Sequence, residues 1–269
     1  MEMTEQYLRL IIEAVNGSIY GPQSVYTRVT PTSVKMRLLT KALQFAGVEP
    51  ARAREIPTTA FETGVGWPIP RTSLGLSMIG RARLSNLRMA VETSLKDDVP
   101  GHLIETGIWR GGSCILMKAV LAAYGVTDRG VYVADSFRGL PEADLSDDAA
   151  DLHDDLTLAV SKEQVRAAFE RFCLLDDNVH FIEGWFSDTL PGLRGIPWAV
   201  VRLDGDQYGS TMDGIANLYP DLSSGGFLIV DDYHVYESCR RAITEYRTAN
   251  GITEEIVNID NIGVFWRKA

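Results

Sequence analysis

Five acidic side chains each follow directly on an apolar run that is typical of a β-strand: Glu105, Asp135, Glu183, Asp204 and Asp231. In an open parallel α/β sheet the carboxyl ends of neighbouring strands share one edge, so these side chains are expected to converge there. For any single one of them, the preference of Asp for turns and helix caps is an equally good explanation. Together they predict a functional site at that edge of the sheet.

Three carboxylates come from two of these strand ends, namely Asp204, Asp231 and Asp232. Mg²⁺ takes oxygen ligands, usually a few carboxylates with water, so this set predicts a magnesium site. The sequence D-G-D-Q-Y-G that begins at Asp204 also resembles the start of an EF-hand loop. That interpretation is rejected, because Ile215 rather than Glu stands at the twelfth position and a strand rather than a helix comes before it.

The turn after the first strand has the composition of a ligand-binding loop. From His102 it reads H-L-I-E-T-G-I-W-R-G-G-S, with Gly107, Arg110 and Gly111 in the turn. Glycine lets the backbone approach a ligand closely. The spacing differs from the G-x-G-x-x-G of dinucleotide binders, and Glu105 stands where a pyrophosphate would need hydrogen-bond donors. The acidic group suits S-adenosylmethionine, which carries an ammonium and a sulfonium, better than it suits NAD.

Residues after the next two strands could hold the nucleoside part of that cofactor. Asp135 can accept hydrogen bonds from both ribose hydroxyls, with Ser136 assisting. Gly184 and Trp185 would place an aromatic plane beside the adenine, although packing in the core explains this Trp equally well.

Methyl transfer to an alcohol requires a base that removes the proton of the hydroxyl. A metal would lower the pKa of that hydroxyl and orient it. The candidate bases are His153, His234 and Asp204, and each His is more commonly an ordinary surface or core residue.

Strand and helix patterns alternate from residue 103 onward. Strands are predicted at 103–105, 131–134, 179–182, 198–203 and 227–230, and helices at 114–124, 162–175, 212–219 and 239–249. This alternation predicts a mostly parallel sheet with helices on both faces. Two further β-rich runs, 255–259 and 263–267, predict an antiparallel hairpin at the C-terminal end.

The first part of the chain has a different character. Helical spacing predicts helices from Thr4 to Gly17, at 32–47 and at 77–95, and the proline- and glycine-rich stretch 57–73 predicts a long loop. We therefore divide the chain into an extension, 1–76, and a catalytic domain, 77–269. The extension could be a lid, an oligomer contact or ordinary packing surface.

Composition limits the possible partners. The 269 residues are 45% hydrophobic, so the chain can bury a full core. The net charge is −10, which argues against binding to the phosphate backbone of a nucleic acid. No apolar run is long enough for membrane insertion, and no export signal is visible, so the cytoplasm is the expected location. Cys114, Cys173 and Cys239 are expected to be reduced thiols.

From about residue 77 onward the chain resembles the macrocin O-methyltransferase family. The resemblance rests on seven stretches in order: S-M-I-G from 77, L-I-E-T-G-I-W-R-G-G from 103, V-A-D-S-F-R-G-L-P from 133, E-G-W-F-S-D-T-L-P from 183, R-L-D-G-D-Q-Y from 202, I-V-D-D-Y from 229 and G-V-F-W-R from 263. It implies a class I methyltransferase fold, a Rossmann-like α/β sheet that is mostly parallel with a C-terminal antiparallel hairpin, here with an N-terminal helical extension.

The resemblance also implies methylation of a sugar hydroxyl with S-adenosylmethionine and Mg²⁺. The metal would be held by Asp204, Asp231 and Asp232, and the cofactor would be contacted by Met78, Glu105, Asp135, Ser136 and Trp185. The acceptor would be a deoxysugar of a glycosylated natural product, or a rhamnose or mannose of a glycolipid or polysaccharide. Residues 1–73 and 142–161 do not match clearly, and they are where the acceptor would be enclosed.

Two alternatives remain open at this stage. A catechol also offers a metal two adjacent oxygens, so a catechol-type O-methyltransferase is one. A catalytically silent methyltransferase fold that acts as a binding module is the other, and the complete set of three carboxylates argues against it. The amphipathic N-terminal helices lead us to expect a homo-oligomer.

Overall fold

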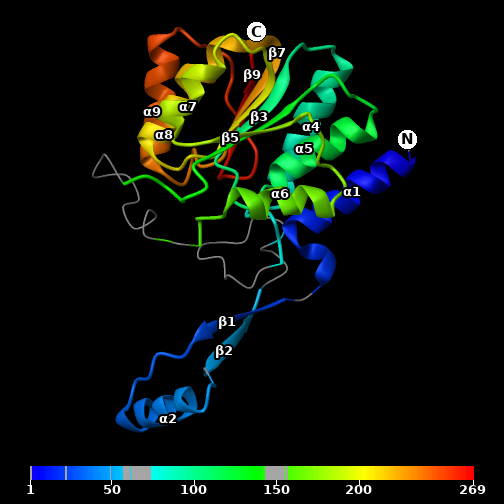
Figure 1. Cartoon of the computed structure of the whole chain (residues 1–269). Helices are drawn as coiled ribbons and strands as arrows, with labels where there is room; N and C mark the ends of the chain where they lie inside the picture. Colours follow the sequence, from blue (N-terminus) through cyan, green and yellow to red (C-terminus); the bar gives the residue numbers. More distant parts are fainter. Residues whose placement is uncertain are drawn as a thin grey trace.

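The computed structural model describes residues 2–21, 23–48, 50–56, 61, 74–142, 155 and 157–269. These form a main body, in which a twisted sheet is covered by helices, and a narrow arm that projects from it (Figure 1). No helix in these ranges is both long and apolar enough to span a membrane.

The main body is built on a sheet of seven strands, in the order β5-β4-β3-β6-β7-β9-β8 within the described residues. Strands β3 to β7 are parallel, and β9 and β8 complete the sheet in antiparallel orientation. The predicted fold class is therefore confirmed. The strands are β3 (His102–Thr106), β4 (Val131–Asp135), β5 (Val179–Glu183), β6 (Trp198–Leu203), β7 (Leu222–Val230), β8 (Val257–Asn258) and β9 (Val264–Arg267).

The strand order reverses at β3, which lies between β4 and β6. In open α/β sheets, the crevice beyond the carboxyl ends of the strands at such a reversal is where ligands bind. The sequence of β3 leads into this crevice through a glycine turn, and α5 (Gly112–Ala123) begins directly after it.

Helices cover both faces of the sheet with separate apolar cores. One core joins the sheet to α1 (Glu2–Asn16), α4 (Arg81–Lys96), α5 and α6 (Lys162–Arg171). The other joins it to α8 (Tyr208–Leu218) and α9 (Glu237–Ala249). Shorter turns are α7 (Phe186–Thr189), η1 (Ser18–Tyr20), η3 (Leu190–Leu193) and η4 (Tyr219–Asp221).

Helix α1 is a layer of the main body. Leu8, Ile11, Ile12 and Val15 recur at helical spacing, and all four are buried in the same core as α5. The helix ends at Asn16, before Gly17, as its sequence predicts. The division of the chain at residue 76 stays a prediction, although α1, which belongs to the predicted extension, packs with the sheet.

The arm consists of β1 (Ser24–Arg28), α2 (Val34–Phe45) and β2 (Ala51–Glu55). The two strands pair in antiparallel register, Ser24 opposite Glu55, and α2 lies at the tip (Figure 1). Ser33 caps α2 by accepting a hydrogen bond from the amide of Met36. The helix was predicted, but the two strands were not. The sequence of β2, A-R-A-R-E, lacks the apolar alternation that marks a strand.

Some predicted boundaries were wrong, for local reasons. Helix α4 begins at Arg81 rather than Ser77, because Gly80 in an extended conformation is its N-cap. Helix α8 begins at Tyr208, four residues earlier than predicted, and β7 begins at Leu222, five residues earlier. The residues that were missed are mainly Ser, Thr and Gly, whose weak periodicity hides a regular element.

Candidate active site

The glycine turn after β3 brings three strand ends together. Gly107 has φ of 83°, and a Cβ there would lie 1.7 Å from the carbonyl oxygen of Asp204. Its amide donates to the carbonyl of Ala134 at 2.9 Å, and the amide of Asp204 donates to the carbonyl of Thr106 at 2.9 Å. Only glycine permits this approach, which positions the ends of β3, β4 and β6 around one space.

A cavity of about 320 Å³ lies at these strand ends. Six of the nine residues predicted to contact the cofactor line it: Met78, Gly107, Asp135, Ser136, Gly184 and Trp185. Of the three predicted metal ligands, Asp204 lines the same cavity. The predicted cofactor region and metal region therefore open into one space.

Asp135 is fixed by the backbone around it. Its carboxylate accepts hydrogen bonds from the amides of Ile108, at 2.9 Å, and Phe137, at 2.7 Å. Burial raises the pKa of Asp135, and these amides act against that rise. Each carboxylate oxygen has two lone pairs, so this side chain can still accept further hydrogen bonds from a ligand in the cavity.

The other three predicted cofactor residues are not among the described residues that line the cavity. Glu105 is 1% exposed, accepts hydrogen bonds from Arg202 and from the Cys114 thiol, and has its pKa raised to about 7 by burial. Arg110 donates to the carbonyl of Gly75 at 3.0 Å. The remaining one, Gly111, is the N-cap of α5 and has a left-handed conformation. Their contact with a cofactor stays a prediction.

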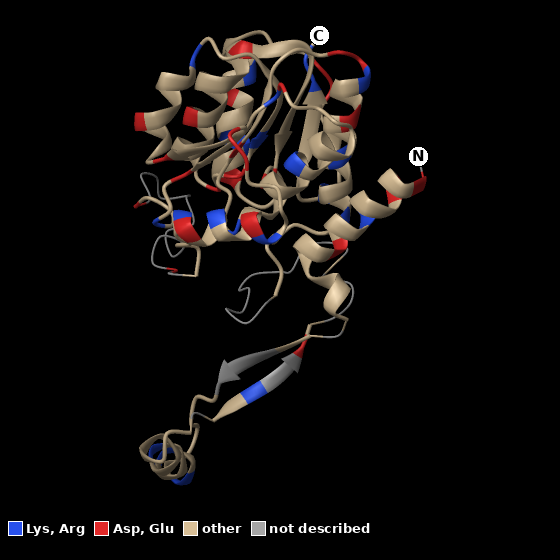
Figure 2. Ribbon diagram, turned by 45° about the vertical axis from the view of Figure 1, so that its right-hand side comes forward, with Lys and Arg blue, Asp and Glu red and all other residues tan. Residues whose placement is uncertain are grey.

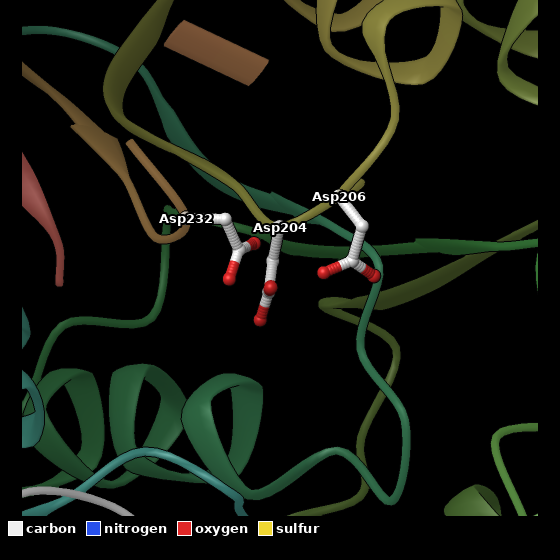
Figure 3. Close-up of side chains that lie close together, drawn as sticks. All are labelled: Asp204, Asp206 and Asp232. Carbon is white, nitrogen blue, oxygen red and sulfur yellow. The ribbon is translucent and has the colours of Figure 1, made fainter. Parts of the chain in front are cut away.

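Three carboxylates form a cluster beside the cavity: Asp204, Asp206 and Asp232 (Figure 3). One oxygen of each lies within 4.8 Å of the others. Asp204 and Asp206 line the cavity, whereas Asp232 is buried. Burial, together with the nearby charges of Asp204 and Asp231, raises the pKa of Asp206 to about 7.

The cluster has an unsatisfied acceptor. Oδ2 of Asp232 is buried and accepts no hydrogen bond from any residue in the described part of the chain. Burial and the neighbouring carboxylates also raise the pKa of Asp232 well above its usual range. A buried acceptor without a donor costs free energy, and a divalent cation would supply the missing partner. The three carboxylates of the cluster therefore fit a hard cation such as Mg²⁺.

Asp231, the third predicted metal ligand, has other partners. One oxygen accepts from Arg202, and the other accepts from Nη1 of Arg83 at 2.5 Å. Arg83 also pairs with Asp260 at 2.9 Å, and Arg202 reaches Asp204 at 2.7 Å. The structure therefore brings Asp204 and Asp232 together with Asp206, and it places Asp231 in a buried ion-pair network.

The three predicted bases are placed differently. Asp204 lines the cavity. His234 is exposed, packs its ring edge-on against Tyr233 at 5.2 Å between centroids, and does not line the cavity. His153 lies outside the described residues.

Sequence reasoning did not assign a role to Asp206, Arg202, Trp109 or Gln207. Gln207 is 3% exposed and donates from Nε2 to the carbonyl of Pro141 at 3.0 Å, which joins the loop after β6 to the loop after β4. Trp109 lines the cavity and donates to the carbonyl of Thr157 at 2.9 Å. The D-G-D sequence was a usable signal for Asp206, but it was weighed only as an EF-hand.

The chain is similar to a known family and to several known proteins. A family model described as macrocin-O-methyltransferase matches residues 4–268. The chain is 43% identical to a mycinamicin III 3''-O-methyltransferase of Micromonospora griseorubida over 98% of this chain and 97% of that one. It is 54% identical to an 8-demethyl-8-(2,3-dimethoxy-alpha-L-rhamnosyl)-tetracenomycin-C 4'-O-methyltransferase of Streptomyces olivaceus, over 76% and 78%.

Solved structures show the same similarity. The O-methyltransferase NovP superposes with a TM-score of 0.83, at 38% identity and with 99% of both chains covered. The calicheamicin methyltransferase CalS11 superposes with a TM-score of 0.56 at 18% identity, covering 89% of this chain and 95% of that one, which shows a shared fold.

Proposed function

The chain belongs to the macrocin-O-methyltransferase family, and from that premise we propose that it transfers the methyl group of S-adenosylmethionine to a hydroxyl of a sugar on a glycosylated small molecule. One observation carries the proposal: Asp135 and Trp185 line the same cavity as Asp204 and Asp206. A nucleoside site and an acidic cluster that share one space suit a reaction between a cofactor and a metal-bound hydroxyl.

We assign the part of the cavity formed by Asp135, Trp185 and Gly107 to the cofactor. The fixed carboxylate of Asp135 would accept hydrogen bonds from the ribose hydroxyls. The indole of Trp185 offers an apolar plane for the adenine. The negative charge of the nearby acidic residues would favour the sulfonium and ammonium groups.

We assign the metal to Asp204, Asp206 and Asp232. The unsatisfied oxygen of Asp232 and the mutual repulsion of three close carboxylates support this assignment. Bound there, Mg²⁺ would lower the pKa of the acceptor hydroxyl and fix its orientation. Asp204, which also lines the cavity, remains the candidate to accept the proton.

A sugar acceptor is supported by the relatives. The tetracenomycin relative is named for a rhamnosyl compound. A sugar presents neighbouring hydroxyls, and the acidic side of the cavity can both ligate a metal and accept hydrogen bonds from such hydroxyls.

Calorimetric titration of S-adenosylhomocysteine tests the cofactor assignment. Asp135→Asn should weaken binding about 10- to 100-fold, because the variant loses a charged acceptor. The matched control is Asp188→Asn, an exposed carboxylate three residues beyond Trp185 that does not line the cavity, and its affinity should be unchanged. Equal affinities for all three proteins would refute the assignment of Asp135.

A further inference from the structure

One side chain joins the two loops that hold the residues assigned above to the metal and to the cofactor. The metal loop, residues 204–207, follows β6, and the nucleoside loop, residues 135–141, begins at the end of β4. Gln207 lines the cavity, is 3% exposed, and donates from Nε2 to the carbonyl of Pro141 at 3.0 Å. A buried hydrogen bond is costly to lose, because its acceptor is left without that donor. The position of one loop therefore depends on the other.

The backbone of Gln207 is fixed on both sides. Its amide donates to the carbonyl of Gly205 at 2.5 Å, and its carbonyl accepts from the amide of Thr211 at 3.0 Å, in the first turn of α8. Gln207 is the N-cap of α8, yet its side chain makes no capping hydrogen bond. Ser, Thr, Asp and Asn are the usual N-cap residues. The side chain of Gln207 therefore serves the contact with Pro141 rather than the helix.

The nucleoside loop is tied together by local hydrogen bonds. Oγ of Ser136 accepts from the amide of Arg138 at 3.0 Å and donates to the carbonyl of Gly139 at 2.6 Å. Ser136 directly follows Asp135, the acceptor that we assign to the ribose hydroxyls. A displacement of Pro141 is therefore transmitted along the loop to Asp135.

The metal loop is held in a conformation that costs free energy. Asp206 has φ of 57°, in the left-handed region that residues other than glycine rarely adopt. Its carboxylate lies within 4.8 Å of oxygens of Asp204 and Asp232, so like charges repel there. Further acidic residues stand at the same edge of the sheet, at the ends of β4 and β7 (Figure 2). A divalent cation would remove this repulsion and stabilise the loop in its present conformation.

We propose that Gln207 is a positioning residue that couples the two sites: a cation in the acidic cluster holds Gln207 against Pro141 and so raises the affinity for the nucleoside of the cofactor. This inference rests on the proposed function. Coupling between two binding sites is reciprocal, so the cofactor raises the affinity for the metal by the same factor. The coupling is positive, because a loop that is already ordered loses less entropy when the second ligand binds.

Calorimetry in two orders measures this coupling in the full chain. S-Adenosylhomocysteine is titrated in EDTA and in saturating Mg²⁺, and Mg²⁺ is titrated with and without saturating S-adenosylhomocysteine. This ligand is the suitable probe, because it lacks the sulfonium charge that a nearby cation would repel. The wild-type protein should gain affinity by about 5-fold or more, equally in both orders. Affinities that do not change with the other ligand would overturn the proposal.

Two variants separate coupling from a structural effect. Gln207→Met has nearly the length of glutamine but no donor, and Gln207→Asn keeps the amide but is one methylene shorter. Each should bind either ligand alone within about 10-fold of the wild-type affinity, and the gain should disappear. A merely structural role would weaken binding but leave the gain unchanged. Circular dichroism checks that the variants are folded, and a folded variant of either kind that keeps the full gain would overturn the proposal.

The matched control is Gln164→Met, near the start of α6. Gln164 is exposed, accepts from the amide of Ser161 at 3.0 Å, and is not among the described residues that line the cavity. The control should keep the full gain, and its loss there would overturn the role of Gln207. Failure of the proposed function gives a different result. S-Adenosylhomocysteine would then not bind under any condition, whereas failure of this inference alone leaves both ligands binding independently.

Discussion

Arg202 connects carboxylates at the ends of three strands of the site. It is 1% exposed and forms ion pairs with Glu105, Asp204 and Asp231, which come from three strand ends. Buried carboxylates are costly unless a cation or a hydrogen-bond donor compensates them. The guanidinium therefore compensates all three carboxylates and holds Asp204 and Asp231 in place.

Removing this guanidinium should destabilise the fold. Arg202→Met leaves buried carboxylates uncompensated and should lower the free energy of unfolding by about 3–5 kcal/mol. Arg267→Met is the matched control, because its ion pair with Asp97 is more than a third exposed and should contribute about 0–1 kcal/mol. Urea unfolding measures both, and equal losses would contradict this account of Arg202.

A pair of Asn variants tests whether Asp206 or Asp231 is the metal ligand beside Asp204 and Asp232. Asp206→Asn should weaken Mn²⁺ or Mg²⁺ binding about 10-fold or more, because it removes one of three clustered carboxylates. Asp231→Asn should mainly lower stability, because it breaks the pairs with Arg83 and Arg202. Calorimetry with the metal and urea unfolding give the two readouts. The opposite pattern would favour the set predicted from sequence, Asp204, Asp231 and Asp232.

Metal affinity should depend on pH. The pKa of Asp206 is raised to about 7, so below that pH a proton competes with the metal for its carboxylate. Affinity should therefore rise as pH increases through about 7. Asp206→Asn should flatten this part of the profile. A wild-type affinity that is constant from pH 6 to pH 8 would be inconsistent with Asp206 as a ligand.

The sequence shows which carboxylates stand at strand ends, but it does not show which of them an arginine reaches. Asp204 was predicted because it directly follows an apolar run, and the cluster contains it. Asp206 was passed over and Asp231 was preferred, since the network of Arg83 and Arg202 depends on side chains that are far apart in the chain. Such long-range pairing leaves no local signal.

Among the elements, the turn between β3 and α5 is the most tightly constrained. Gly107→Ala combines a left-handed φ with a Cβ that would overlap the carbonyl of Asp204. We expect it to reduce both stability and the affinity for S-adenosylhomocysteine, with a stability loss of about 2 kcal/mol or more. Gly125→Ala is the control, because its φ is 68° but nothing lies within 4 Å of the added Cβ.

The Gly125→Ala control should lose only about 1 kcal/mol of unfolding free energy and should bind S-adenosylhomocysteine with unchanged affinity. Thermal melts and calorimetry on the two variants give the comparison. A Gly107→Ala protein as stable as Gly125→Ala would mean that the close approach to β6 does not matter.

Elements with strong apolar periodicity were predicted well, and the two strands of the arm were not. Strands β4 and β6 agree with their apolar runs to within a residue. Strand β2, A-R-A-R-E, alternates small and charged residues, and it becomes a strand only by pairing with β1. Pairing of that kind is a tertiary effect, which overrides weak local preference.

At the scale of the whole molecule, the order of elements predicts the sheet because crossover rules leave few topologies open. The same rules place the carboxyl ends of β3, β4 and β6 together, and the cavity is found there. The crossover rules do not identify the acceptor, because they concern the order of strands and not the side chains of the loops. His153 and the rest of 143–154 lie outside the described residues.

We propose that one cavity uses S-adenosylmethionine and a divalent cation to methylate a sugar. The most direct measurement is transfer of a labelled methyl group from S-adenosylmethionine to a panel of glycosides with neighbouring free hydroxyls, with simple catechols in parallel. We expect a labelled glycoside, loss of transfer with EDTA and recovery with excess Mg²⁺. Transfer that persists unchanged in EDTA, or transfer to catechols alone, would contradict it.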